Sequence, residues 1–130
     1  MYQETTEGIT ISVTPSFLKD RSSPEERRWV FAYTIEIANG SDRTVQLRSR
    51  YWHIMDESGH VEEVRGIGVV GEEPVLAPGD SFTYTSGCPL GTPSGIMRGH
   101  FRMECEDGHA FDACVPAFSL DAPAQPRVLN

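Results

Sequence analysis

The segment 29–37, Trp29-Val30-Phe31-Ala32-Tyr33-Thr34-Ile35-Glu36-Ile37, decides the fold. Its large apolar residues fill the odd-numbered positions, and smaller or polar residues fill most of the positions between them. Period-two alternation rich in aromatic and β-branched residues is typical of a strand that buries one face. The sequence therefore predicts a core β-strand over this segment.

Shorter alternating segments lie on both sides of it, separated by turn signals such as Asn39-Gly40-Ser41-Asp42 and Ala77-Pro78-Gly79-Asp80. We expect further strands over residues 9–14, 45–55, 61–65, 81–86, 96–105 and 110–117. We expect a polar loop over Gly87–Gly95, and loose ends over residues 1–7 and 122–130. No stretch of ten residues has the pattern of an amphipathic helix.

Seven or eight short strands predict an all-β fold, an antiparallel β-sandwich of the immunoglobulin-like or fibronectin type III-like class, with a β-barrel as the competing architecture. The length of 130 residues suits a single domain, 1–130, with a core of about 8–120 and an extended tail over 121–130.

The charge balance restricts the partners. Lys and Arg number 11 against 19 Asp and Glu, a net charge of −8, so the surface repels nucleic acid and anionic membrane. No segment is long and apolar enough for a spanning helix, and no apolar signal segment follows Met1. We therefore expect a cytoplasmic protein that contacts neither nucleic acid nor membrane.

The last two strands allow a prediction about the cysteines. Asp107-Gly108-His109 has the composition of a three-residue hairpin loop, which would set Cys105 opposite Phe111. In that register Cys105 points into the core and Cys114 points outward. The sequence therefore predicts no disulfide between these two cysteines.

The segment Gly66-Ile67-Gly68-Val69-Val70-Gly71 matches the spacing of a dinucleotide-binding loop. That loop needs a helix after its third glycine, whereas Glu72-Glu73-Pro74 follows here. We interpret the glycines as a crossover or bulge between sheets; the alternative is a small-anion site formed by Gly66, Gly68 and Gly71, with Arg65.

A second candidate is a face of the strand over 45–55, where Arg48, Arg50 and Trp52 alternate. Arginine and tryptophan are enriched at interaction hot spots, so this stripe is a candidate interaction face. The alternative is that the strand has one apolar core face and one ordinary solvated face, with the Arg stems covering Trp52. The four histidines have no metal-ligand spacing, and no nucleophile has a recognisable base. We therefore expect no catalytic residues, no metal site and no cofactor.

Several blocks of the chain resemble the bacterial ApaG (CorD) family, in the family's order. They are Phe31-Ala32-Tyr33, Arg50-Tyr51-Trp52-His53-Ile54, the segment 66–74, Ala77-Pro78-Gly79, Tyr84-Thr85-Ser86-Gly87, Gly99-His100-Phe101 and the segment 115–120. The resemblance implies a fibronectin type III-like sandwich and an association with cobalt tolerance and magnesium handling. It also implies a gene neighbourhood with a diadenosine tetraphosphate hydrolase, and related eukaryotic domains that act as interaction modules.

Together these observations predict a non-enzymatic binding module, monomeric or weakly homodimeric, whose partner is another protein. The alternative is a binder of pyrophosphate or dinucleoside polyphosphates, or a weak phosphohydrolase, that uses the Gly66–Gly71 loop. The resemblance supports this alternative, because that loop has been suggested as a pyrophosphate site in the family.

Overall fold

A computed structural model describes residues 2–123, and within that range almost every residue lies in a strand or a tight turn. The strands are β1 (Tyr2–Thr6), β2 (Ile9–Phe17), β3 (Trp29–Asn39), β4 (Val45–Asp56), β5 (Val61–Ile67), β6 (Val75–Leu76), β7 (Ser81–Leu90), β8 (Ser94–Cys105) and β9 (Ala110–Asp121). Two 3₁₀ turns, η1 (Lys19–Arg21) and η2 (Pro24–Glu26), connect β2 to β3. No helix in residues 2–123 could span a membrane. Most of the predicted tail, residues 124–130, lies outside the described residues.

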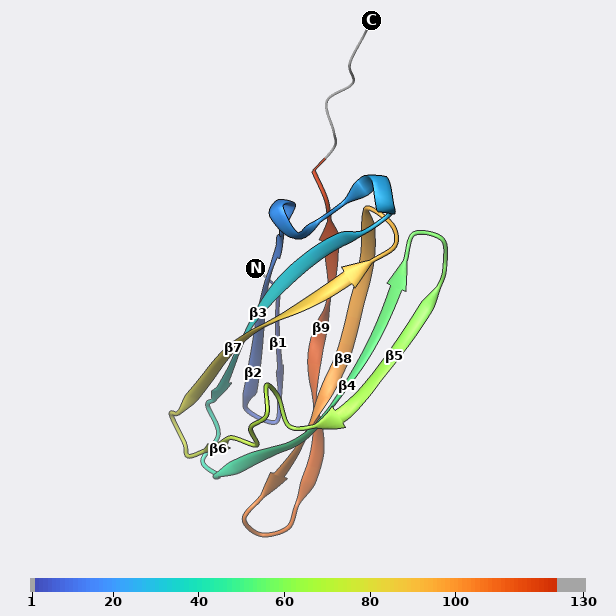
Figure 1. Cartoon of the computed structure of the whole chain (residues 1–130). Coiled ribbons are helices and arrows are strands. Elements are labelled where there is room, and N and C mark those ends of the chain that lie inside the picture. Colours follow the sequence, from blue (N-terminus) through green and yellow to red (C-terminus); the bar gives the residue numbers. More distant parts are fainter. Residues whose placement is uncertain (1, 124–130) are drawn as a thin grey trace, which may run out of the picture.

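The strands form two antiparallel sheets that pack face to face (Figure 1). One sheet has the order β1-β2-β3-β7, and the other has the order β5-β4-β8-β9, with β6 paired to β4. The predicted all-β antiparallel sandwich is confirmed.

The two lateral sides of the sandwich differ. Along one side β1 lies beside β9, where the Cys114 amide donates to Thr6 Oγ1 (3.2 Å) and the Ser119 amide donates to Tyr2 OH (3.3 Å). Along the other side β7 and β5 are the edge strands, and no strand pairing joins them in the described chain. The sandwich is therefore closed along β1 and β9 and open along β7 and β5.

The alternation in β3 explains the core. Phe31, Tyr33, Ile35 and Ile37 point inward and are at most 5% exposed. Each such side chain stabilises the fold by about 1.5–3 kcal/mol when it leaves water. Tyr33 meets Trp52 of β4 edge to face, with 5.4 Å between ring centroids, so the two sheets interlock at this point.

The prediction of a loose N-terminus is wrong, because β1 pairs with β2 through the tight turn at Glu7-Gly8. A prediction that relies on alternating apolar residues does not detect β1, because β1 is an edge strand with mostly polar side chains. Those side chains pair across the strands instead: Gln3 Nε2 donates to Ser12 Oγ (3.1 Å). An edge strand of this kind carries little hydrophobic signal.

Several predicted strand ends are also too early. β2 continues beyond Pro15 to Phe17, and β5 continues to Ile67. The polar loop predicted over Gly87–Gly95 is wrong, since β7 runs to Leu90 and β8 starts at Ser94. The inward alternation of β7 simply continues through Cys88 and Leu90, which are 3% and 7% exposed.

The loop of the β8–β9 hairpin has the predicted length of three residues but begins one residue earlier than predicted. Its three loop residues are 106–108: the Cys105 amide donates to the His109 carbonyl, and Gly108 has a φ of +88°. Met103 therefore faces Phe111, where the sequence predicted Cys105. A shift of two leaves the faces unchanged, so Cys105 is buried and Cys114 is exposed. Both thiols are free, as predicted.

Candidate functional site

The predicted Arg48, Arg50 and Trp52 stripe does not form one face. A bulge in β4 shifts its register between Leu47 and Ser49, which takes Arg48 out of line with the other two residues. Arg48 is exposed and forms an ion pair with Glu73 (3.3 Å). Trp52 is 2% exposed in the core, so it offers no surface to a partner on the outside of the sheet.

Arg50 lies at the open side of the sandwich, on the inner face of β4. Its guanidinium covers Gly66 of β5, where an added Cβ would come within 2.7 Å of Nη1. From there Nη1 donates to the carbonyls of Ile67 (3.1 Å) and Gly68 (2.9 Å). Gly66 therefore makes room for the arginine, and the arginine fixes the chain that follows β5.

The glycine segment ends in a tight hairpin, in place of the predicted crossover or bulge. Val69 and Glu72 exchange backbone hydrogen bonds of 2.8 and 2.9 Å around Val70 and Gly71. Both central residues have positive φ, +45° and +79°, as a type I′ turn requires. At Gly68, with φ +62°, an added Cβ would lie 2.3 Å from the Glu72 carbonyl oxygen. Each glycine therefore has a structural reason.

The hairpin and Arg50 enclose a cavity of about 200 Å³ at the open side. Its other walls come from β3, β4 and β7. The lining residues are Tyr33, Arg50, Trp52, Val69, Val70, Gly71, Tyr84 and Ser86. Arg50 carries the only charge in this lining, so the cavity is cationic within an acidic protein.

Tyr84 is the unusual member of this lining. It is 7% exposed, and its hydroxyl is buried without a hydrogen-bond partner in the described chain. An unpaired buried hydroxyl costs about 1–3 kcal/mol. Burial raises the pKa of both Tyr84 and Tyr33, although Arg50 counteracts part of each rise. Both hydroxyls therefore remain protonated donors at neutral pH, within the field of the same guanidinium.

The hairpin supplies further donors. The backbone amides of Val70 and Gly71 have no hydrogen-bond acceptor within residues 2–123, whereas those of Gly68, Val69 and Glu72 are paired. Ser86 adds a hydroxyl from β7. The cavity is thus lined by one guanidinium and several residues that carry N–H or O–H donors, a set of groups suited to a small anion.

A second chamber of about 220 Å³ continues along the open side and shares Tyr33, Arg50, Trp52 and Ser86 with the first. Its additional walls are mostly apolar, apart from Glu62. Burial raises the pKa of the Cys88 thiol here to about 11, with the Glu62 carboxylate adding to the rise. The thiol is therefore protonated, and Glu62 disfavours a second anion in this chamber.

Two of the four acidic residues around the glycine segment, Glu63 and Glu73, are paired away from the cavity. Glu63 accepts from Tyr51 OH (2.9 Å) and pairs with Arg65 (3.2 Å) on the outer face of the sheet. Arg65 itself lies over the Tyr51 ring, 4.7 Å from its centroid. The structure thus places Arg65 away from the cavity, while Glu73 is paired with Arg48.

The sequence prediction missed Tyr33, Tyr84 and Ser86 as site residues. They come from β3 and β7, and meet Arg50 of β4 only when the two sheets stack, so no local spacing connects them. One signal was present in the sequence: Arg50 lies two and four residues before the inward-facing Trp52 and Ile54, so it is on the same face of the strand. Among residues 2–123, no group of three His, Cys, Asp or Glu could hold a metal ion.

Comparison with known proteins identifies the family of the chain. The ApaG domain matches residues 19–105. The chain is 59% identical over all 130 residues to Protein ApaG of Brucella anthropi, covering 100% of both chains. A crystal structure of a Bordetella pertussis protein assigned as ApaA superposes with a TM-score of 0.86 at 46% identity, over 90% of this chain and 95% of that one.

A more distant likeness concerns the fold alone. The C-terminal domain of wzt superposes with a TM-score of 0.55 at 12% identity, over 96% of this chain and 79% of that one. Full-length identity and a matching domain signature together establish the family. The chain belongs to the ApaG family.

Proposed function

We propose that this protein is a non-enzymatic binding module whose ligand presents one small anionic group to the cavity formed by Arg50, Tyr84 and the 69–72 hairpin. The observation that carries the proposal is the buried Tyr84 hydroxyl, which has no hydrogen-bond partner in the described chain and belongs to a residue that lines the same cavity as Arg50. A phosphate or carboxylate oxygen would accept from both groups and remove the cost of the unpaired hydroxyl.

The lining of the first chamber favours binding over catalysis. Its polar side chains are two tyrosines, one serine and one arginine, and none of these is a base at neutral pH. Raised tyrosine pKa values reinforce this, because neither phenol loses its proton. The cavity can therefore hold and orient an anion without offering a group to activate water.

Pyrophosphate and dinucleoside polyphosphates remain the candidate ligands. In this proposal the glycines shape the hairpin, and one phosphate contacts Arg50, Tyr84 and the amides of Val70 and Gly71. Glu62 lines the adjoining chamber, so we expect one phosphate unit of such a ligand to enter the cavity and the other units to stay outside that chamber. The links to cobalt tolerance and magnesium handling, a protein partner and a cytoplasmic location stay predictions.

Replacing Arg50 by glutamine is expected to weaken pyrophosphate binding by about 10–100-fold, since a charged donor in such a site contributes about 1.5–3 kcal/mol. Trp52 lines both chambers, so its fluorescence reports occupancy. Arg48→Gln is the matched control, because Arg48 is on the same strand but pairs with Glu73 outside the cavity. Equal affinities for wild type and Arg50→Gln would refute the proposal.

A further inference from the structure

The open side of the sandwich leaves one edge strand without the usual protection. β7 pairs along its whole length with β3, and its other edge is unpaired in the described chain. Its sequence, Ser81-Phe82-Thr83-Tyr84-Thr85-Ser86-Gly87-Cys88-Pro89-Leu90, contains no charged residue. The edge strand opposite, β5, carries Glu62, Glu63 and Arg65. Charges on an edge discourage strand addition, so β7 is the edge that can accept a partner.

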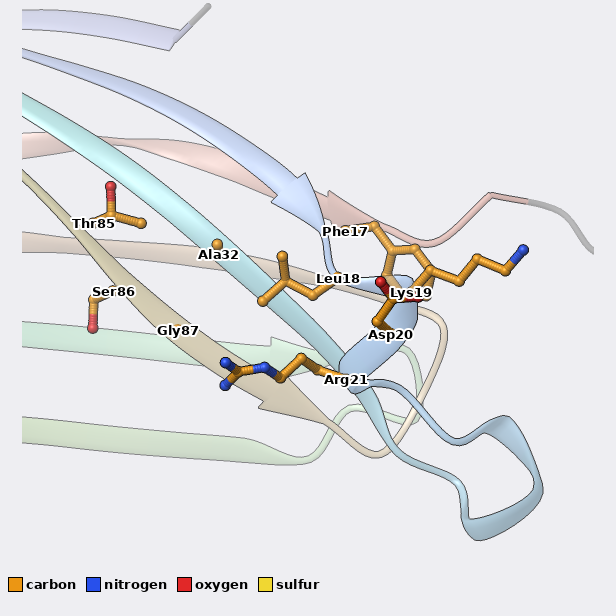
Figure 2. A pocket seen from close by; sticks show the side chains of 9 residues that line it. All are labelled: Phe17, Leu18, Lys19, Asp20, Arg21, Ala32, Thr85, Ser86 and Gly87. Atoms are coloured by element: carbon orange, nitrogen blue, oxygen red, sulfur yellow. The ribbon is translucent and has the colours of Figure 1, made fainter.

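The outer face beside this edge holds a wide groove of about 680 Å³ (Figure 2). Its floor consists of small residues of β3 and β7, among them Ala32, Thr85 and Gly87. Figure 2 shows Arg21 of η1 extending over the groove toward β7. Lys19 and Asp20 of the same turn also line the groove, so its charged residues carry a net positive charge, and Arg21 has no ion pair within residues 2–123.

The inner face beside the same edge is the cavity described above. Thr85 and Ser86 point to opposite sides of β7 (Figure 2), and Ser86 lines both cavity chambers. The edge strand therefore has a cation on each side, Arg21 outside and Arg50 inside. An added strand alternates its side chains between the same two sides.

We propose that residues 84–88 of β7 accept an extended acidic peptide segment of a partner protein as an added strand. Backbone hydrogen bonds to β7 would hold the peptide, with one acidic side chain at Arg21 and another in the Arg50 cavity. The second contact rests on the proposed function, because it uses the same anion site. Pro89, which lacks an amide hydrogen, limits the pairing at its C-terminal end.

The test uses the full chain and an end-blocked peptide in which two adjacent glutamates are flanked by valines, so that an added strand presents one glutamate to each side of the sheet. Amide NMR shifts of Thr85, Ser86 and Gly87 are expected to move saturably. A lysine–valine peptide is expected to bind at least about tenfold more weakly, and Arg21→Gln to weaken the glutamate peptide by about three- to tenfold. Two methylated versions of the glutamate peptide separate strand addition from side-chain docking. One carries methyl groups on the backbone nitrogens of its odd-numbered residues, and the other carries them on those of its even-numbered residues. Only one of them should bind, because only every second amide faces β7.

Three results would overturn the proposal: no movement of the β7 amides at millimolar peptide, equal binding of both methylated versions, or β7 shifts that follow protein dilution without peptide. The last would mean that a second copy of this chain occupies the edge. Pyrophosphate titrated into the same samples keeps the two proposals apart. If pyrophosphate moves the amides of Val70 and Gly71 while the peptide leaves β7 unmoved, strand addition fails and the anion site stands.

Discussion

Tyr84→Phe is expected to raise the free energy of unfolding of the ligand-free protein by about 1–3 kcal/mol, because it removes a buried hydroxyl that has no partner. The ring keeps its contacts with Phe82 and Phe101, so no cavity is created in the core. The same substitution should weaken anion binding by about tenfold or more, since a donor to the charged ligand is lost. Urea unfolding with and without pyrophosphate measures both effects.

Tyr33→Phe is the matched control. Tyr33 is similarly buried, at 5% exposed, but its hydroxyl is not among the buried groups that lack a partner, and the nearby Ser86 side chain offsets part of the rise that burial causes in its pKa. Losing that hydroxyl should lower stability by about 0.5–1.5 kcal/mol, opposite in sign to Tyr84→Phe. A loss of stability in Tyr84→Phe comparable to that in Tyr33→Phe would mean that the Tyr84 hydroxyl is satisfied in the free protein, and the main support for the site would disappear.

Gly68→Ala is expected to lower the free energy of unfolding by about 2–4 kcal/mol. The new Cβ would lie 2.3 Å from the Glu72 carbonyl oxygen, and that oxygen is held by the hairpin hydrogen bond from Val69. Positive φ at Gly68 adds the strain of a left-handed conformation to this clash. Thermal and urea unfolding of the variant give the magnitude.

Gly71→Ala separates the two causes. Gly71 also has positive φ, +79°, but an added Cβ would meet no atom within 4 Å. Its loss of stability should therefore be about 1–2 kcal/mol, from backbone strain alone. If the two variants lose the same stability, the close approach of Gly68 to Glu72 is not a real constraint, and the account of the hairpin is wrong.

The two glycine variants also test why the glycines have the spacing of a phosphate-binding motif. The spacing of Gly66, Gly68 and Gly71 matches a phosphate-binding fingerprint, yet each glycine has a reason within the fold: space for Arg50, close approach to Glu72, and the turn itself. In the proposed site the donors are Arg50, Tyr84 and the amides of Val70 and Gly71, so Gly71 is the one motif glycine that would contact the anion. A motif match can thus lie beside a candidate binding site while most of the proposed ligand contacts come from residues outside the motif.

The sequence predicted the central strands well because their burial is one-sided. Alternation in β3 is strong, so both its existence and its inward face were correct. In β8 and β9 the faces of Cys105 and Cys114 were also correct, although the hairpin loop lies one residue earlier than predicted. A loop displaced by one residue shifts the register by two and leaves side-chain parity intact. The face to which a side chain points is therefore easier to predict than the residue that it faces on the neighbouring strand.

The candidate site was harder to predict, for two physical reasons. First, the bulge between Leu47 and Ser49 changes parity within β4, so Arg48 and Arg50 seemed to share a face when only Arg50 turns inward. The change was visible in the sequence, since the inward residues Val45 and Leu47 have odd numbers while Trp52 and Ile54 have even ones. Second, the cavity forms between the two sheets. Residues that meet only when the sheets pack together have no fixed separation along the sequence, so no motif reveals them.

The most direct test of the anion site is an amide NMR titration of the wild-type chain and Tyr84→Phe with pyrophosphate. We expect saturable shifts of the Val70 and Gly71 amides in the wild type, the same shifts at about tenfold higher ligand concentration in Tyr84→Phe, and no shift at the remote turn glycine Gly108. Unmoved hairpin amides at millimolar pyrophosphate, or identical titrations of the two proteins, would contradict the assignment of Arg50 and Tyr84 as the anion site.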